Sequence, residues 1–154
     1  MLIDLQRATA ELTASPDLCR AVLASPGMLE ERYVLSDREK RQLLAMVNHP
    51  GMQGSCSLYR INRVVPLILN LPQTLDSFGT DLETVLAGYW QEHPWGYRYS
   101  FVECERFCQW LRDNPQRWGE AGEALQTVLT AEEAELCRHR REVEAQASAG
   151  EPEG

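Results

Sequence analysis

The sequence predicts an all-α protein, built as a compact array of about seven helices, and two observations lead to this prediction. A Ser or Thr is followed three residues later by Glu in four places, which is the pattern of a capping box at a helix start: Ser36, Thr80, Ser100 and Thr130. Helix-ending Pro-Gly pairs or single prolines follow the apolar segments, at Pro26, Pro50, Pro94 and Pro115. These signals place helices near residues 2–14, 16–25, 37–48, 54–71, 81–92, 101–113 and 120–146.

The first three of these helices have clear boundaries. The segment 2–14 ends at Ser15, which is an N-cap candidate for the next helix, with Pro16 at the first helical position. The third helix follows Ser36, and its apolar residues fall on one side, so we expect them to face inward: Leu43, Leu44 and Val47. Because the connections are short, we expect a single helical domain over residues 1–146, with a disordered tail over residues 147–154.

The fourth helix contains the most apolar stretch of the chain, residues 58–72. At 100° per residue one broad face is apolar, and we expect it to be buried: Leu58, Ile61, Val64, Val65, Ile68, Leu69 and Leu71. A polar stripe lies opposite, formed by Tyr59, Arg63, Pro66 and Asn70 and flanked by Arg60 and Asn62. Pro66 has no N–H, so we expect a kink there. The polar residues either bind neighbouring helices or face a partner, and we favour a structural role for Asn62 and a partner for the arginines.

The last three helices are amphipathic as well. The helix 81–92 lines a core face with Leu82, Val85, Leu86 and Tyr89. The helix 101–113 has apolar residues at helical spacing, namely Phe101, Cys104, Cys108 and Leu111. Along the final helix acidic residues precede basic ones, which suits the helix dipole.

An aromatic segment, residues 95–101, interrupts the helical pattern. Trp95, Tyr97, Tyr99 and Phe101 alternate with Gly96, Arg98 and Ser100, as in a strand. A single strand needs a partner, either within the protein or in a bound peptide. The short length favours an aromatic loop over the helices, and one short β segment is the alternative.

The composition limits the classes of function. The net charge of −8 argues against general binding to nucleic acid, which needs a basic surface. No acidic residue lies between Glu39 and Asp76, so this window is locally basic or simply mostly core. No apolar run reaches the ~18–20 residues of a membrane span, and the N-terminus has no signal-type segment. Five scattered cysteines suit reduced thiols, so we expect a cytoplasmic protein.

No motif indicates catalysis or a metal site. Cys104 and Cys108 share a helix face among aromatic residues, where free cysteine behaves as a small hydrophobe, and zinc would need four ligands. His49 and His93 precede prolines at helix ends, where histidine interacts favourably with the dipole. Nucleotide-binding and hydrolase motifs are absent from the sequence. The sequence therefore predicts a binding protein without a cofactor of its own.

Residues of the central helix and of the segments after it also resemble a known family. These residues are Tyr59-Arg60-x-Asn62-Arg63, Pro72, Gly79, Leu82, Tyr89, His93-Pro94, Phe107-x-x-Trp110-Leu111 and Pro115, with Leu5-Gln6-Arg7 near the start. The chain resembles, over roughly residues 1–115, the N-terminal helical domain of bacterial proteins that are often labelled DNA-binding. They are encoded beside multinuclear non-haem iron oxidases that modify cysteines in ribosomally made peptides. Two departures from the family pattern are expected to matter: the second, partly β domain of the longer members has no counterpart in this sequence, and residues 17–47 match poorly. The chain therefore resembles a short partner subunit, and it is similar to the small partner subunits of the 3-thiaglutamate pathway.

The resemblance implies a non-catalytic partner subunit that forms a heterodimer with the iron oxidase, which holds the iron, and recruits the leader of a precursor peptide. The residues expected to bind peptide or partner are Tyr59, Arg60, Asn62, Arg63, Trp95, Tyr97, Arg98 and Tyr99. Arginines hold carboxylates in bidentate pairs, and Trp, Tyr and Arg concentrate binding energy at interfaces. A DNA-binding regulator, as the family label suggests, and an independent enzyme using Cys104, Cys108 or a histidine are the alternatives.

Overall fold

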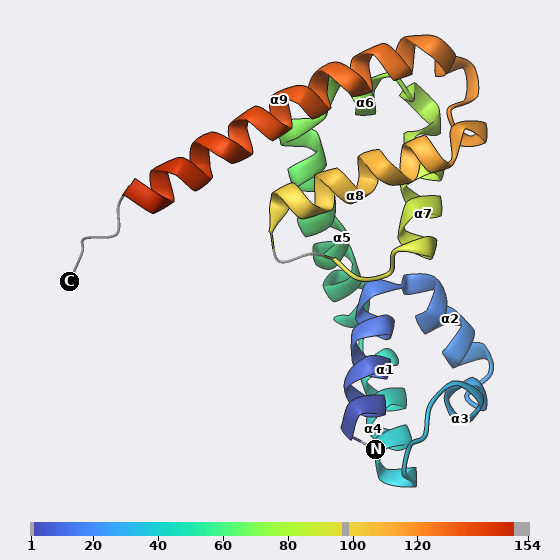
Figure 1. The fold of residues 1–154 in the computed structure, drawn as a ribbon. Helices are drawn as coiled ribbons and strands as arrows, with labels where there is room; N and C mark the ends of the chain where they lie inside the picture. The colour runs from blue at the N-terminus through green and yellow to red at the C-terminus, as the bar shows by residue number, and fades with distance from the viewer. Residues whose placement is uncertain (1, 97–98, 150–154) are drawn as a thin grey trace. The chain divides into compact units, whose positions relative to one another are not determined.

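The computed structural model describes residues 2–96 and 99–149, and these residues form helices without a strand, so the all-α prediction is confirmed (Figure 1). The chain divides into two compact units, residues 1–62 and 63–154. Helix α5 (Met52–Asn70) contributes its first part to the first unit and its second part to the second unit. The single domain that we expected over residues 1–146 stays a prediction.

The first unit contains four helices before α5: α1 (Leu2–Ala14), α2 (Pro16–Ala24), α3 (Met28–Arg32) and α4 (Asp37–Val47). Helices α1, α2 and α4 contact one another. Apolar residues of these helices, of α3 and of the start of α5 form one core, whose members include Ala8, Leu12, Val22, Leu29, Leu43, Val47, Met52 and Cys56. The one-turn helix α3 was not expected from the sequence, because five residues are too few to show a helical period.

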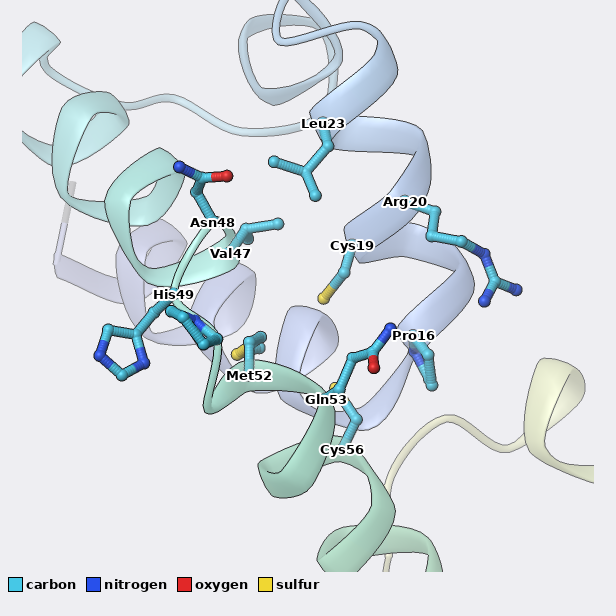
Figure 2. Close-up of a pocket in the computed structure, with 11 residues that line it drawn as sticks. Pro16, Cys19, Arg20, Leu23, Val47, Asn48, His49, Met52, Gln53 and Cys56 are labelled. Carbon is cyan, nitrogen blue, oxygen red and sulfur yellow. The ribbon is translucent and has the colours of Figure 1, made fainter.

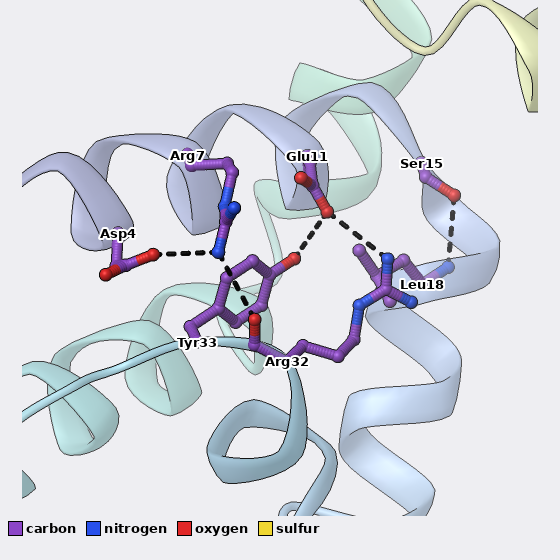
Figure 3. Close-up of polar contacts among 7 residues, drawn as sticks. All are labelled: Asp4, Arg7, Glu11, Ser15, Leu18, Arg32 and Tyr33. Atoms are coloured by element: carbon purple, nitrogen blue, oxygen red, sulfur yellow. Dashed lines mark hydrogen bonds and ion pairs between the residues drawn. The ribbon is translucent and has the colours of Figure 1, made fainter.

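Polar contacts around Tyr33 join α3 to α1 (Figure 3). The Tyr33 hydroxyl donates to Glu11 Oε2 at 2.6 Å, and Arg32 Nη2 lies 3.3 Å from the same oxygen. Arg7 bonds both Asp4 at 2.7 Å and the Arg32 carbonyl at 3.3 Å. Burial, together with the Glu11 carboxylate, raises the pKa of Tyr33 to about 12, so its hydroxyl remains a donor at neutral pH.

Of the five predicted N-caps, two are confirmed and three are wrong, although helices α7 and α8 begin within one residue of the predicted positions. Ser15 caps α2 by accepting from the Leu18 amide at 3.1 Å, and Ser36 forms a full capping box with Glu39. At Ser100 the glutamate that would complete the box, Glu103, instead pairs with Arg63. Thr130 lies inside a longer helix and donates to the Gln126 carbonyl, and at Thr80 a 3₁₀ turn precedes the helix. The predicted cap at Ser100 fails because Glu103 has another partner. The caps at Thr80 and Thr130 fail because the backbone is already helical at these residues.

Replacing Ser36 with alanine is expected to destabilise the protein by about 1 kcal/mol, the usual cost of a lost N-cap. The Ser36 hydroxyl accepts from the Glu39 amide, while Glu39 Oε2 accepts from the Ser36 amide at 2.7 Å. These bonds lower the pKa of Glu39, so the box contributes stability above the unfolded pKa of a glutamate and loses it as pH falls through the folded value. Urea unfolding at neutral and acidic pH measures this, and equal loss at both would contradict the pH dependence.

The second unit contains α6 (Pro72–Asp76), α7 (Leu82–Glu92), α8 (Ser100–Asp113) and α9 (Gly122–Ala149). Three 3₁₀ turns connect them, at Gly79–Asp81, Pro115–Arg117 and Gly119–Ala121. An aromatic cluster lies at the centre of the core, where the Tyr89 ring is 5.1 Å from Phe107 and 5.6 Å from Trp110. The Trp110 indole N–H donates to Glu92 Oε2 at 2.8 Å, so its polar atom is satisfied.

Two helical features of the second unit differ from the expectation. The one-turn helix α6, with Pro72 at its first position, was counted as the end of the preceding helix. Helix α9 continues to Ala149, so residues 147–149, which we expected in a disordered tail, are helical. Helix α9 packs against α6 and α8, and its C-terminal part extends beyond the other helices of this unit (Figure 1).

Candidate functional site

The buried side of helix α5 includes Arg63 of the polar stripe, whereas most of the predicted apolar face is exposed, which is the opposite of the expected orientation. Met52 and Cys56 are buried in the first unit, and Arg63 and Leu67 are buried in the second. The apolar residues that we expected in the core are exposed in both units: Leu58 by 62% and Ile61 by 51%, and Val65 by 41%, Ile68 by 52% and Leu69 by 73%. Of the predicted apolar face only Leu71 is buried and Val64 partly so. The expected burial of this face is therefore wrong.

Arg63 is the reason for this orientation in the second unit. Its guanidinium donates to Glu103 Oε1 through Nε at 3.1 Å and through Nη2 at 2.8 Å. Its Nη1 donates to the carbonyl of His93 at 2.7 Å, and its Cζ lies 5.3 Å from the centre of the Tyr89 ring. Arg63 and Glu103 are only 4% and 2% exposed, so a charged pair is buried with several hydrogen bonds. The predicted role of Arg63 as an exposed contact to a partner is therefore wrong.

The rest of the stripe in the second unit also has internal partners. The carbonyl of Pro66 accepts from Asn70 Nδ2 at 2.8 Å and from the Cys104 thiol at 3.3 Å. Helix α5 runs through Pro66, and the expected kink stays a prediction. Together these contacts hold the polar side of α5 against α8.

The other predicted binding residues have different environments. Tyr59 and Arg60 are half-buried in the first unit, and Asn62 is exposed, so its expected structural role gains no support from burial. In the second unit Trp95 and Tyr99 are exposed and lie outside any helix or strand. The expected residues Tyr97 and Arg98 lie outside the described residues, and the described remainder of the segment contains no strand.

The surface that sequence reasoning missed is the apolar patch of α5, by which we mean Val65, Ile68 and Leu69 in the second unit. These residues share one side of the helix at spacings of three and four. A signal for the correct orientation was available. If the helix is taken to begin at Met52, directly after Pro50-Gly51, one of its sides carries the residues that are buried in the structure: Met52, Cys56, Arg63 and Leu67. Contiguous exposed apolar side chains of this kind mark interaction surfaces more often than scattered ones do.

Two thiols and two imidazoles of the second unit are packed against other groups. Burial raises the pKa of Cys104 to about 12, and it raises the pKa of Cys108 further, so both remain thiols at neutral pH. His93 packs on the Tyr89 ring at 5.1 Å, and His139 packs on Phe101 at 5.7 Å. Among residues 2–96 and 99–149, no group of three or more His, Cys, Asp or Glu side chains is placed to hold a metal.

A pocket of about 340 Å³ lies between the start of α8 and the C-terminal part of α9. Its lining is mainly apolar, with Tyr99, Phe101, Val102 and Val143, and Arg140 and Glu144 pair with each other at its edge. Such a pocket has the shape and chemistry to receive an apolar or aromatic side chain.

No helix in the described parts of the chain has both the length and the apolar character needed to cross a membrane.

Comparisons with models of protein families, with curated proteins and with solved structures found no match to this chain.

Proposed function

We propose that this chain is a non-catalytic partner subunit of an iron-dependent oxidase that modifies cysteine in a ribosomally made precursor peptide. In this proposal the oxidase holds the iron, the two proteins form a heterodimer in the cytoplasm, and this chain recruits the peptide. It needs no cofactor of its own for that role. The observation that supports the proposal is the apolar patch of α5, whose side chains are exposed among the residues that the structure describes.

The α5 patch is proposed as the contact with the oxidase. Side chains such as Ile68 and Leu69 gain about 25 cal/mol for each Å² removed from water, so a partner that covers them gains affinity. The opposite side of this part of α5 is held by Arg63, so the patch is presented on an anchored helix. An anchored surface loses little conformational entropy on binding.

The exposed aromatic residues Trp95 and Tyr99 are proposed as contacts with the precursor peptide. Tyr99 also lines the apolar pocket beside α9, which offers a place for a side chain of the leader. Tyr and Trp supply large contact areas at low cost in conformational entropy. The DNA-binding alternative requires a basic surface, and the net charge of −8 opposes it.

Mixing this protein with an iron oxidase and a precursor peptide encoded beside its gene tests the proposal. We expect the oxidase alone to modify the peptide slowly, and the oxidase with this chain to modify it at full rate. The paired variant Ile68→Glu with Leu69→Glu should reduce binding to the oxidase more than about 10-fold, because two charges would be buried at the interface. Size-exclusion chromatography and peptide mass spectrometry measure the two effects.

The matched control is Leu2→Glu with Ile3→Glu. These adjacent residues are also Leu and Ile, they are 68% and 79% exposed, and they lie on α1 in the first unit. Both variants add two negative charges, so a difference between them in oxidase binding reports a specific role of the α5 patch. Full modification by the oxidase alone would disprove the function. Equal binding by the two variants would disprove the role of the patch, and a salt-dependent gel shift on the upstream DNA would favour the regulator.

A further inference from the structure

A pocket of about 270 Å³ opens in the first unit between α2, the end of α4 and the start of α5 (Figure 2). Two of the five cysteines line it, Cys19 from α2 and Cys56 from α5, together with the thioether residue Met52. Figure 2 shows the Cys19 side chain directed from α2 toward the part of α5 that carries Met52 and Cys56. The pocket therefore brings sulfur side chains from two helices to one place.

The two thiols are close to each other because they share a hydrogen-bond acceptor. The carbonyl oxygen of Leu12 accepts from Cys19 Sγ at 3.1 Å and from Cys56 Sγ at 3.5 Å. The sulfur atoms are therefore separated by no more than the sum of these two distances. Burial, and after it the neighbouring Cys56 thiol, raises the pKa of Cys19 to about 12.

We propose that Cys19 and Cys56 bind one soft monovalent metal ion, of the Cu(I) type, as a two-coordinate bis-thiolate site. Soft thiolate ligands favour Cu(I), whereas a structural zinc site needs four ligands. In the part of the chain that the structure describes, no group of three or more His, Cys, Asp or Glu side chains gathers, so a four-ligand site has no basis there. Binding of one ion releases both thiol protons and leaves two thiolates on the metal.

The position of this pair distinguishes it from the other cysteines. Cys104 and Cys108 are 0% exposed within the aromatic core of the second unit, and Cys104 donates to the Pro66 carbonyl. Cys137 lies alone on the surface of α9. Cys19 and Cys56 combine two neighbouring sulfurs with a pocket that both residues line.

Titration of the reduced full-length chain with Cu(I), against a chromogenic Cu(I) chelator and without oxygen, tests the site. We expect one ion per chain, with release of two protons. Cys19→Ser and Cys56→Ser should each weaken binding more than about 100-fold, since loss of a direct ligand exceeds the usual cost of losing a supporting residue. Cys137→Ser and Cys108→Ala are the matched controls, and both should bind as the wild type does.

A measurement on the wild-type protein avoids any effect of the variants on folding. Bound Cu(I) should block the slow alkylation of Cys19 and Cys56 by iodoacetamide and leave that of Cys137 unchanged, as mapped by peptide mass spectrometry. No uptake by the wild type, unchanged affinity in folded Cys19→Ser and Cys56→Ser variants, or equal alkylation with and without Cu(I) would each overturn the proposal. The titration needs neither oxidase nor peptide, so its result is independent of the proposed partner function.

Discussion

Replacing Arg63 with alanine is expected to lower the free energy of unfolding by about 3–5 kcal/mol, the usual cost of removing one partner from a buried ion pair. The variant would leave the Glu103 carboxylate in the interior without the guanidinium that contacts it at 2.8 Å. It would also remove the donor to the His93 carbonyl. Because small domains are stable by only about 5–15 kcal/mol, this loss is large. Urea denaturation followed by circular dichroism measures it.

Two further variants show whether the buried charge causes the loss. The double variant Arg63→Met with Glu103→Leu removes both charges, so it should recover much of the stability, since apolar replacements of buried pairs are often neutral. Arg138→Ala breaks an exposed pair with Glu135 and should change stability by less than about 1 kcal/mol. If Arg63→Ala were no worse than Arg138→Ala, the proposed anchoring of α5 would be wrong.

Arg63 variants should also affect partner binding, but through folding rather than through contact. The Arg63→Ala protein is expected to lose oxidase binding together with its stability, whereas Ile68→Glu with Leu69→Glu should lose binding and remain folded. The difference follows from burial, because Arg63 is enclosed and the α5 patch is exposed. The two variants together separate an anchoring residue from a binding residue.

Replacing Glu132 with alanine is expected to destabilise the protein by about 3 kcal/mol, because hydrogen bonds to a charged group are worth roughly 1.5–3 kcal/mol each. Glu132 lies on α9, and its two carboxylate oxygens accept from the amides of Gln73 at 2.8 Å and Thr74 at 2.9 Å. These amides are in the first turn of α6, where intrahelical acceptors are missing. The side chain therefore caps α6 and binds it to α9.

Thermal unfolding and hydrogen exchange measure this effect. We expect faster exchange of the Gln73 and Thr74 amides in Glu132→Ala, and an intermediate effect in Glu132→Gln, which keeps one oxygen acceptor but loses the charge. Glu142→Ala, at an exposed position on the same helix, is the control and should change stability by less than about 0.5 kcal/mol. Unchanged amide exchange in Glu132→Ala would contradict the capping role.

The sequence alone was enough for features that depend on neighbouring residues. The all-helical class, most helix boundaries at proline and glycine, and the caps at Ser15 and Ser36 all agree with the structure. A cap depends on residues two or three positions away, so its chemistry is visible in a short window.

Only the tertiary structure decided which side of α5 is buried and what the acidic residues do. Periodicity identified two sides of the helix, and the apolar side was assigned to the core because burying polar groups is costly. That cost is removed when distant residues supply the missing partners, as Glu103 does for Arg63, 40 positions along the chain. Glu132 likewise reaches back 58 positions to Thr74, and Cys19 and Cys56 meet at the carbonyl of Leu12. Local pattern determines where helices form, whereas pairing between distant residues determines which of their faces remain free to bind.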